Sequence, residues 1–255
     1  MKNLSVLILL VSVQILFVSC KTESEAQQTF VVKNDQQLRE VKLATIAPVI
    51  DGIADDPAWE MAEWYEIDER WIGKKYSKKD FSGRYTLKWT PEGLYILAEI
   101  TDDILDDQHP DPLDNFWNDD CLEVFVDEDN SGGDHQYNYN AFAYHIALDG
   151  NVTDTSPEGN ARLYNANVES AHTTNGNITT WEVLVTIFDH TYVDDLPNEP
   201  VILKPNKKMG FAIAYCDNDG SPERENFIGS IPVAGKDKNR GWIDAGIFGT
   251  LLLTE

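Results

Sequence analysis

The chain has 255 residues, of which 44 are acidic and 20 are basic, giving a formal net charge of −24. An electrostatic field of that sign repels a phosphate backbone and argues against nucleic acid as a partner. Hydrophobic residues make up 42% and aromatic residues 11% of the chain, so a substantial core is expected and global disorder is excluded. The length suits one large all-β domain or two small domains.

The first 20 residues have the organisation of an export signal. Lys2 precedes an apolar run over residues 4–18, and the segment ends in F-V-S-C at Cys20. This ending resembles the lipobox of bacterial lipoproteins, in which the cysteine becomes the lipidated first residue. We therefore predict a signal peptide over 1–19, a lipid on Cys20, and an acidic tether over 20–40 that holds the protein at a bacterial membrane, by expectation the outer one. The alternative is an ordinary signal peptide cut near Ser19.

The domain is expected to run from residue 41 to 255 and to begin with a short edge strand within residues 39–50, where Pro48 disfavours a central position. Asp56 is a good helix N-cap and Pro57 a good first helical residue. They predict one or two helical turns over Pro57–Trp64. Trp59 is expected to plug one end of the fold.

Short apolar or alternating segments then recur, separated by Gly-, Pro- and Asn-rich turns. We expect strands at 83–90, 94–101, 121–127, 137–148, 161–170, 179–187, 210–217, 227–231 and 248–253. Many short strands without long helical patterns are typical of an antiparallel sandwich. The predicted fold is therefore an all-β, jelly-roll-like antiparallel β-sandwich with one short N-terminal helix.

The segment 121–127 carries the strongest functional signal. Leu122, Val124 and Val126 fall on one face and indicate core, whereas Glu123 lies on the other face beside Phe125. A strand that serves only stability does not need a carboxylate next to an aromatic ring. Trp117 stands just before this strand among polar residues, where an indole is expected to be partly exposed. We interpret the stretch as one wall of a sugar-binding site; the alternatives are an indole that caps the sandwich edge and a solvated carboxylate. Trp89 and Trp181 belong to strand patterns and are expected in the core.

An oxygen-rich turn follows the same strand. Asp127, Asp129 and Ser131 alternate before Gly132, as in the first half of a calcium loop, and Asp134 is a candidate later ligand. The closing Glu of an EF-hand is absent. The pattern predicts a structural Ca²⁺ here, with a hairpin turn rich in turn-forming residues as the alternative.

Two cysteines remain after Cys20, and both belong to predicted strands. Cys121 and Cys216 are either free buried thiols or a disulfide, and the sequence does not decide between them. The five histidines show no spacing typical of a metal site, and no nucleophile-elbow or nucleotide-binding loop is present.

Four segments, in order along the chain, resemble carbohydrate-binding modules of family 9. They are I-D-G-x-x-D-D-x-x-W (50–59), G-L-Y-I-x-x-x-I-x-D (93–102), D-D-x-x-E-V-F-V-D (119–127) and F-G-x-L-x-L (248–253). The resemblance implies a β-sandwich that binds sugars, in most members without catalytic groups, and calcium as a common structural ion. It also implies a sugar held between two aromatic rings with polar groups at its hydroxyls. Trp117 matches the first ring and Glu123 the ligand carboxylate.

The second ring of the family belongs to the loops after the strand 210–217. In this chain that region offers Arg224, Asn226 and Phe227, with no Trp before Trp242. Phe227 or Trp242 is expected to serve as the ring, and Asn226 to contribute as a ligand residue. Arg224 has the fork geometry to bond sugar oxygens, with pairing to Glu223 or Asp219 as the alternative.

The sequence thus favours a lipid-anchored, non-catalytic protein that binds a glycan, with a glycoside hydrolase as a candidate partner. The runner-up is a glycoside hydrolase, or the accessory domain of one, because paired carboxylates abound. A third hypothesis is a haem domain on a similar sandwich, for which Met61 and Met209 are the internal methionines.

Overall fold

The structure, a computed structural model, describes residues 37–255. The predicted signal peptide and Cys20 lie outside the described residues. The first strand, β1 (Arg39–Lys42), starts inside the segment expected as the tether. No helix in the described part of the chain combines the length and the apolar character needed to cross a membrane.

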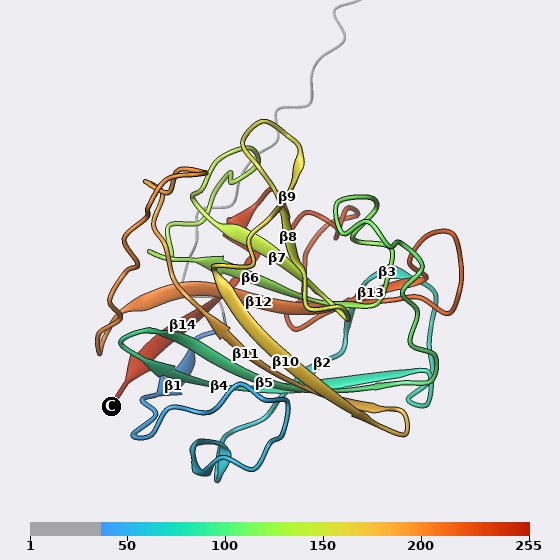
Figure 1. Cartoon of the computed structure of the whole chain (residues 1–255), viewed down its shortest axis with the longest axis horizontal. Coiled ribbons are helices and arrows are strands. Elements are labelled where there is room, and N and C mark those ends of the chain that lie inside the picture. Colours follow the sequence, from blue (N-terminus) through green and yellow to red (C-terminus); the bar gives the residue numbers. More distant parts are fainter. Residues whose placement is uncertain (1–36) are drawn as a thin grey trace, which may run out of the picture.

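Two β-sheets pack face to face, and the predicted antiparallel β-sandwich is confirmed (Figure 1). The larger sheet has the order β1, β14 (Gly249–Thr254), β12 (Lys208–Asp217), β6 (Cys121–Asp127), β7 (Phe142–Ala147), β8 (Val152–Thr155) and β9 (Ala161–Leu163), with β13 (Asn226–Gly229) beside β12 and β3 (Glu69–Gly73) beside β13. The smaller sheet has the order β10 (Val168–Asn175), β11 (Ile178–Val185), β5 (Gly93–Asp102), β4 (Phe81–Thr90) and β2 (Tyr65–Ile67). Every named strand pair is antiparallel except β1 with β14, which is parallel.

The main core lies between the two sheets. Leu122, Val124 and Val126 of β6 are buried there, as the alternation predicted. Trp89 and Trp181, from the facing sheet, are also buried in this core, which confirms their predicted role. Each fully buried side chain of this size contributes about 1.5–3 kcal/mol to folding, so this layer accounts for most of the driving force.

The helix expected over 57–64 is a single 3₁₀ turn, η1 (Pro57–Trp59), so that prediction is wrong in kind and length. The indole Nε1 of Trp59 donates to Glu182 Oε1 at 2.8 Å, and the ring packs with Tyr95 and Leu97 in a small cluster. Trp59 therefore contacts the smaller sheet, away from the main core, and does not plug the end of the sandwich.

Three strands were missed and two predicted strands have different limits. β2, β3 and β8 had no alternation strong enough to predict them. The strand expected over 161–170 is divided into β9 and β10, and the one expected over 137–148 starts only at Phe142. Cys121 and Cys216 lie directly opposite each other on β6 and β12 as free, buried thiols, so of the two alternatives the unbridged one is observed.

Candidate functional site

The outer face of β6, away from the main core, forms the floor of the site. The register places Glu123 opposite His145 of β7 on one side and opposite Ala214 of β12 on the other. Ala143 and Ala212 flank Phe125 in the next row of the same face. The small side chain of Ala214 leaves room beside Glu123, and residues of the surrounding loops line the space.

A cavity of about 340 Å³ opens above this floor. Five of the six predicted ligand residues line it: Trp117, Glu123, Arg224, Phe227 and Trp242. The other lining residues are Phe116, Tyr137, His145, Asp154, Thr155, Gly159 and Asn239. Chain segments far apart in sequence therefore converge here, and the two predicted tryptophans come from the β5–β6 loop and from the segment between β13 and β14 (Figure 1).

Asn226 is the predicted residue that the structure does not bring into the cavity. Its neighbour Phe227 lines the space, and consecutive residues of a strand point to opposite faces. The side chain of Asn226 is buried elsewhere, where its Nδ2 donates to Asp217 Oδ2 at 3.2 Å. The expectation that Asn226 is a ligand residue is therefore not supported by the geometry.

Two indoles offer exposed surface to the cavity. Trp117 is 41% and Trp242 38% exposed, whereas Phe227 is 2% exposed. The guanidinium of Arg224 covers the face of Phe227, with its Cζ 4.1 Å from the ring centroid. Phe227 is thus covered by Arg224, and of the two candidates for the second ring Trp242 is the one with exposed surface in the cavity.

Phe116, a residue that the sequence did not single out, packs against the indole of Trp117. Phe116 meets Trp117 edge-on, with the ring centroids 5.0 Å apart, and also meets the imidazole of His145 at 4.7 Å. Such edge-to-face pairs contribute about 0.5–1.5 kcal/mol beyond the burial of surface. Phe116 therefore couples the indole of Trp117 to the floor of the cavity.

Charged groups at the floor are paired with one another. His145 Nε2 lies 3.1 Å from Glu123 Oε2. Burial lowers the pKa of His145, but Glu123 and Cys216 together outweigh this effect and raise the pKa to about 10. Arg224 lies close by, with Nη1 3.0 Å from Cys216 Sγ and Nη2 3.2 Å from Asn239 Oδ1. The guanidinium is therefore held by Cys216 and Asn239 rather than by the acidic neighbours that the sequence suggested.

Asp154 adds a second carboxylate to the wall of the cavity, although no sequence pattern pointed to it. Its Oδ2 accepts the N–H of Ala143 at 2.7 Å and its Oδ1 that of Thr155 at 2.6 Å. Burial raises the pKa of Asp154 to about 7, although these two hydrogen bonds act in the opposite direction. Asp154 belongs to β8, one of the strands that alternation did not predict, which is why it was missed.

Consecutive polar residues after Trp117 fix its loop against the loop that carries Arg224. The carbonyl of Asn118 accepts from Asn218 Nδ2 at 2.7 Å, and its side-chain Oδ1 accepts the N–H of Arg224 at 3.2 Å. Asp120 accepts the N–H of Asn218 at 2.8 Å. All of these acceptors are buried, so the two loops are tied together without water. The relative position of the indole and the guanidinium follows from these bonds.

Asp120 also belongs to a buried group of acids at the end of β5 and β12. The hydroxyl group of Tyr215 donates a hydrogen bond to Asp102 Oδ2 at 3.1 Å. Burial, followed by the charge of Asp102, raises the pKa of Asp120 to about 10. Burial also raises the pKa of Asp102 to about 6 and that of Asp217 to about 7. The pair Asp102–Asp120 therefore retains a proton at neutral pH.

This group predicts an unusual dependence of stability on pH. A carboxyl group whose folded pKa lies above its unfolded value near 3.9 contributes stability below that value, and the contribution is lost as pH rises through the folded pKa. For Asp102 the loss falls between about pH 4 and about pH 6 and for Asp120 it extends toward about pH 10. Asp102→Asn removes the titration of Asp102 itself and the charge that, together with burial, raises the pKa of Asp120. When the pH is raised from about 5 to about 8.5, the melting temperature of the variant should therefore fall by less than that of the wild type.

Differential scanning calorimetry at several pH values measures this difference. Asp55→Asn, at an exposed position, is the matched control and should follow the wild-type profile. Burial lowers the pKa of His135 to about 4, so this group adds stability as the pH rises from about 4. Because His135 is present in all three proteins, its contribution cancels in the comparison. Parallel profiles for the wild type and Asp102→Asn would contradict the shared-proton pair.

The oxygen-rich turn joins β6 to the next segment. Asp127 Oδ2 accepts the N–H of Gly132 at 2.8 Å, and Asp129 Oδ1 accepts that of Ser131 at 2.9 Å. Asp134 lies further along, where it forms a β-bridge with Asp244. Asp127, Asp129 and Ser131 thus share one tight turn, whereas the backbone of Asp134 is engaged at a different contact.

The two internal methionines do not share a site. Met209 is fully buried in the main core and Met61 is fully exposed. Axial ligation of a haem by this pair is therefore excluded by their placement.

Comparison with known proteins decides the family. Residues 50–255 match the family model described as "Carbohydrate family 9 binding domain-like". This chain belongs to that family. The match covers all four segments on which the resemblance was based, and the predicted assignment to family 9 is confirmed.

Curated relatives carry this domain as a small part of larger enzymes. The chain is 26% identical over 209 residues to the endo-1,4-beta-xylanase A of Thermotoga neapolitana, which covers 81% of this chain. The corresponding enzyme of Thermotoga maritima is 25% identical over 209 residues. The chain spans 17% of the length of each of these two relatives.

Solved structures share the fold. A family 9 carbohydrate-binding module from Caldicellulosiruptor kristjanssonii in complex with cellotriose has a TM-score of 0.61 at 18% identity, covering 85% of this chain and 94% of that one. The module from the same organism in complex with glucose has a TM-score of 0.60 at 18% identity, with coverages of 85% and 96%. A putative carbohydrate-binding protein from Bacteroides uniformis has a TM-score of 0.53 at 13% identity, with coverages of 86% and 99%.

Proposed function

We propose that the cavity above β6 binds one sugar unit of a glycan between the indoles of Trp117 and Trp242, without cleaving it. The observation that carries the proposal is that these two partly exposed rings line one cavity whose floor is charged. A sugar ring has apolar C–H faces and a rim of hydroxyls. Aromatic plates suit the faces, and a few convergent polar groups orient the rim.

The polar contacts would come from Glu123, Asp154 and Arg224, all of which line the cavity. Carboxylates accept from hydroxyl groups, and a guanidinium donates to the ring and hydroxyl oxygens. Because Arg224 is already fixed by Cys216 and Asn239, little side-chain entropy is lost when a sugar binds. Preorganisation of this kind favours a recognition role.

The runner-up, glycoside hydrolysis, would use Glu123 and Asp154 as its carboxylate pair. Each of them already has a partner in the structure: Glu123 is paired with His145, and Asp154 accepts two backbone N–H groups. These contacts hold both carboxylates in fixed positions at the wall of the cavity, which suits recognition of a bound sugar. We therefore favour a binding domain that acts beside a separate glycoside hydrolase.

Isothermal titration calorimetry with glucose, cellotriose and xylotriose tests the proposal, together with an assay for released reducing ends on the same samples. These ligands represent the sugars in the related structures and the substrate class named for the related enzymes. We expect binding without any release of reducing ends. Absence of binding to all three and to a broader glycan panel would overturn the proposal, as would hydrolysis that is lost in Glu123→Gln.

We propose a structural Ca²⁺ at the turn formed by Asp127, Asp129 and Ser131. The support is the sequence pattern and the placement of all three residues in one tight turn, where hard oxygen ligands suit calcium. Addition of Ca²⁺ after chelation should raise the melting temperature, and Asp129→Asn should remove most of that response. Asp134→Asn, outside the tight turn, is the comparison variant. An equal response in the wild type and Asp129→Asn would contradict the site.

The lipid anchor at Cys20 is proposed from the sequence pattern alone. In a bacterial host that processes lipoproteins, the wild-type chain should fractionate with the membrane, and Cys20→Ser should release it into the soluble fraction. Fractionation of both forms with the soluble proteins would refute the anchor.

A further inference from the structure

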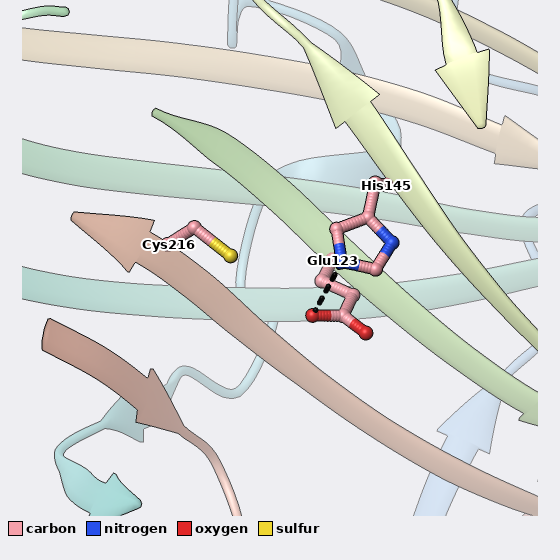
Figure 2. A group of neighbouring side chains, drawn as sticks. All are labelled: Glu123, His145 and Cys216. Atoms are coloured by element: carbon pink, nitrogen blue, oxygen red, sulfur yellow. Dashed lines mark ion pairs between the residues drawn. The ribbon is translucent and has the colours of Figure 1, made fainter. Parts of the chain in front are cut away.

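Beneath the cavity, three side chains with metal-binding atoms converge from three adjacent strands. Glu123 comes from β6, His145 from β7 and Cys216 from β12, and one ligand atom of each lies within 4.8 Å of the others (Figure 2). All three residues are buried. Among the groups of this kind in the part of the chain that the structure describes, this is the one that combines nitrogen, oxygen and sulfur donors.

The contact between Glu123 and His145 is close but is not a well-formed hydrogen bond. Oε2 of Glu123 lies 3.1 Å from Nε2 of His145. This oxygen is nevertheless buried without a hydrogen-bond partner among the described residues. A buried, ionised oxygen in that condition is costly unless a further group completes its surroundings. The contact is therefore an ion pair that leaves Glu123 Oε2 able to accept a further ligand.

The other ring nitrogen of His145 is engaged with the backbone. Nδ1 lies 3.2 Å from the carbonyl oxygen of Ala143, to which it can only donate. Metal-binding histidines characteristically donate their second N–H to a carbonyl or carboxylate, which fixes the tautomer and the ring orientation. Once the proton on Nε2 is displaced, its lone pair faces Glu123 and Cys216.

The sulfur of Cys216 is turned toward this pair (Figure 2). Arg224 Nη1 lies 3.0 Å from Sγ, and a positive donor at that distance favours the thiolate, which is the form that binds metals. The guanidinium also reduces the local charge. His145 is protonated at neutral pH, and a metal ion must displace its Nε2 proton in order to bind. With His145 then neutral, Glu123 and Cys216 ionised and Arg224 charged, the set carries a net charge of −1, a suitable environment for a divalent cation.

We propose that Glu123, His145 and Cys216 bind a divalent transition-metal ion of the zinc class. Zinc takes thiolate, imidazole and carboxylate ligands together, whereas calcium and magnesium prefer oxygen alone. Three protein ligands leave one position of a tetrahedral ion for water or a ligand oxygen. The site is distinct from the oxygen-rich turn at Asp127, and its existence does not depend on sugar binding, although the two sites share Glu123.

Cobalt titration tests the site directly, because Co²⁺ bound to a thiolate has a charge-transfer band in the near ultraviolet and Zn²⁺ does not. The protein is the full chain with Cys20→Ser, reduced and freed of metals by chelation, so that Cys121 and Cys216 are the remaining thiols. We expect the band to saturate at about one Co²⁺ per chain and to disappear when Zn²⁺ is added, in keeping with the higher affinity of Zn²⁺ for such sites.

Single substitutions test which residues are metal ligands and which only lie nearby. Cys216→Ser should abolish the band, and Glu123→Gln and His145→Gln should each weaken Co²⁺ binding by at least about tenfold. Cys121→Ser is the matched control, because this thiol lies opposite Cys216 on β6 but is outside the donor group, and its band should persist. Circular dichroism verifies that each variant is folded.

Absence of the band in the folded parent protein would overturn the metal site, and so would its persistence in Cys216→Ser or an equal loss in Cys121→Ser. The titration contains no sugar, so its failure would leave the proposed glycan site untouched. If both sites exist, saturation with Zn²⁺ should change the affinity for the sugar, because Glu123 serves both.

Discussion

Trp117→Ala should weaken sugar binding at least about 30-fold while the protein remains folded. The indole is 41% exposed and lines the cavity, so its removal takes away stacking surface without opening the main core. Loss of a central aromatic contact costs at least about 2 kcal/mol, which corresponds to about a 30-fold or greater increase in Kd. Trp242→Ala should have an effect of the same size, because the proposal places one face of the sugar on each ring. Calorimetric titration of each variant with the tightest-binding oligosaccharide measures both.

A third tryptophan provides the control. Trp64 is half-buried against the smaller sheet, with the guanidinium of Arg84 4.3 Å from its ring, and it does not line the cavity. Trp64→Ala should leave sugar affinity unchanged even if it lowers stability. Undiminished binding in both Trp117→Ala and Trp242→Ala would refute the two-ring site, whereas loss in all three variants would indicate a general effect of unfolding.

Gly229→Ala should be the most destabilising single-methyl substitution near the site. A Cβ at this position would lie 2.0 Å from Cζ2 and 2.2 Å from Cε2 of Trp71, because the indole lies directly on the glycine. Trp71 cannot move easily. Its Nε1 donates to the carbonyl of Ile231 at 2.9 Å, and its ring meets Phe227 edge-on at 5.0 Å. Displacement of so large a buried ring should cost about 3 kcal/mol or more, a fall in melting temperature of about 6–12 °C.

The same substitution should also change the sugar affinity, because Trp71 packs on Phe227, and Phe227 supports the guanidinium of Arg224. Thermal unfolding followed by tryptophan fluorescence measures the stability, and titration below the transition measures the sugar affinity. Gly249→Ala is the matched control: its new methyl would meet its nearest atom, the carbonyl oxygen of Phe211, at 3.3 Å instead of 2.0 Å, so a smaller loss of stability than for Gly229→Ala is expected. If Gly229→Ala has the same melting temperature as the wild type, the prediction is wrong and Trp71 can be accommodated in another position.

The sequence by itself determined the β-sandwich, the family and the parts of the site that depend on local pattern. Period-two alternation identified β6 and placed Leu122 and Val124 in the core, since side chains of a strand alternate between faces whatever the partners are. The polar setting of Trp117 predicted its partial exposure, and the scarcity of aromatic residues in the late loops left Phe227 and Trp242 as the candidates for the second ring. Each of these inferences uses only near neighbours in the chain.

Tertiary structure alone decided which of those candidates meet and what surrounds them. Phe227 is covered by Arg224, which leaves Trp242 as the candidate ring with exposed surface. Glu123 lies beside His145 and Cys216 because of the register of β6 with β7 and β12, and register depends on the pairing of segments distant in sequence. Local pattern fixes which face of a strand a side chain occupies. Only the pairing of strands and the covering of their outer face by loops fixes what that side chain touches.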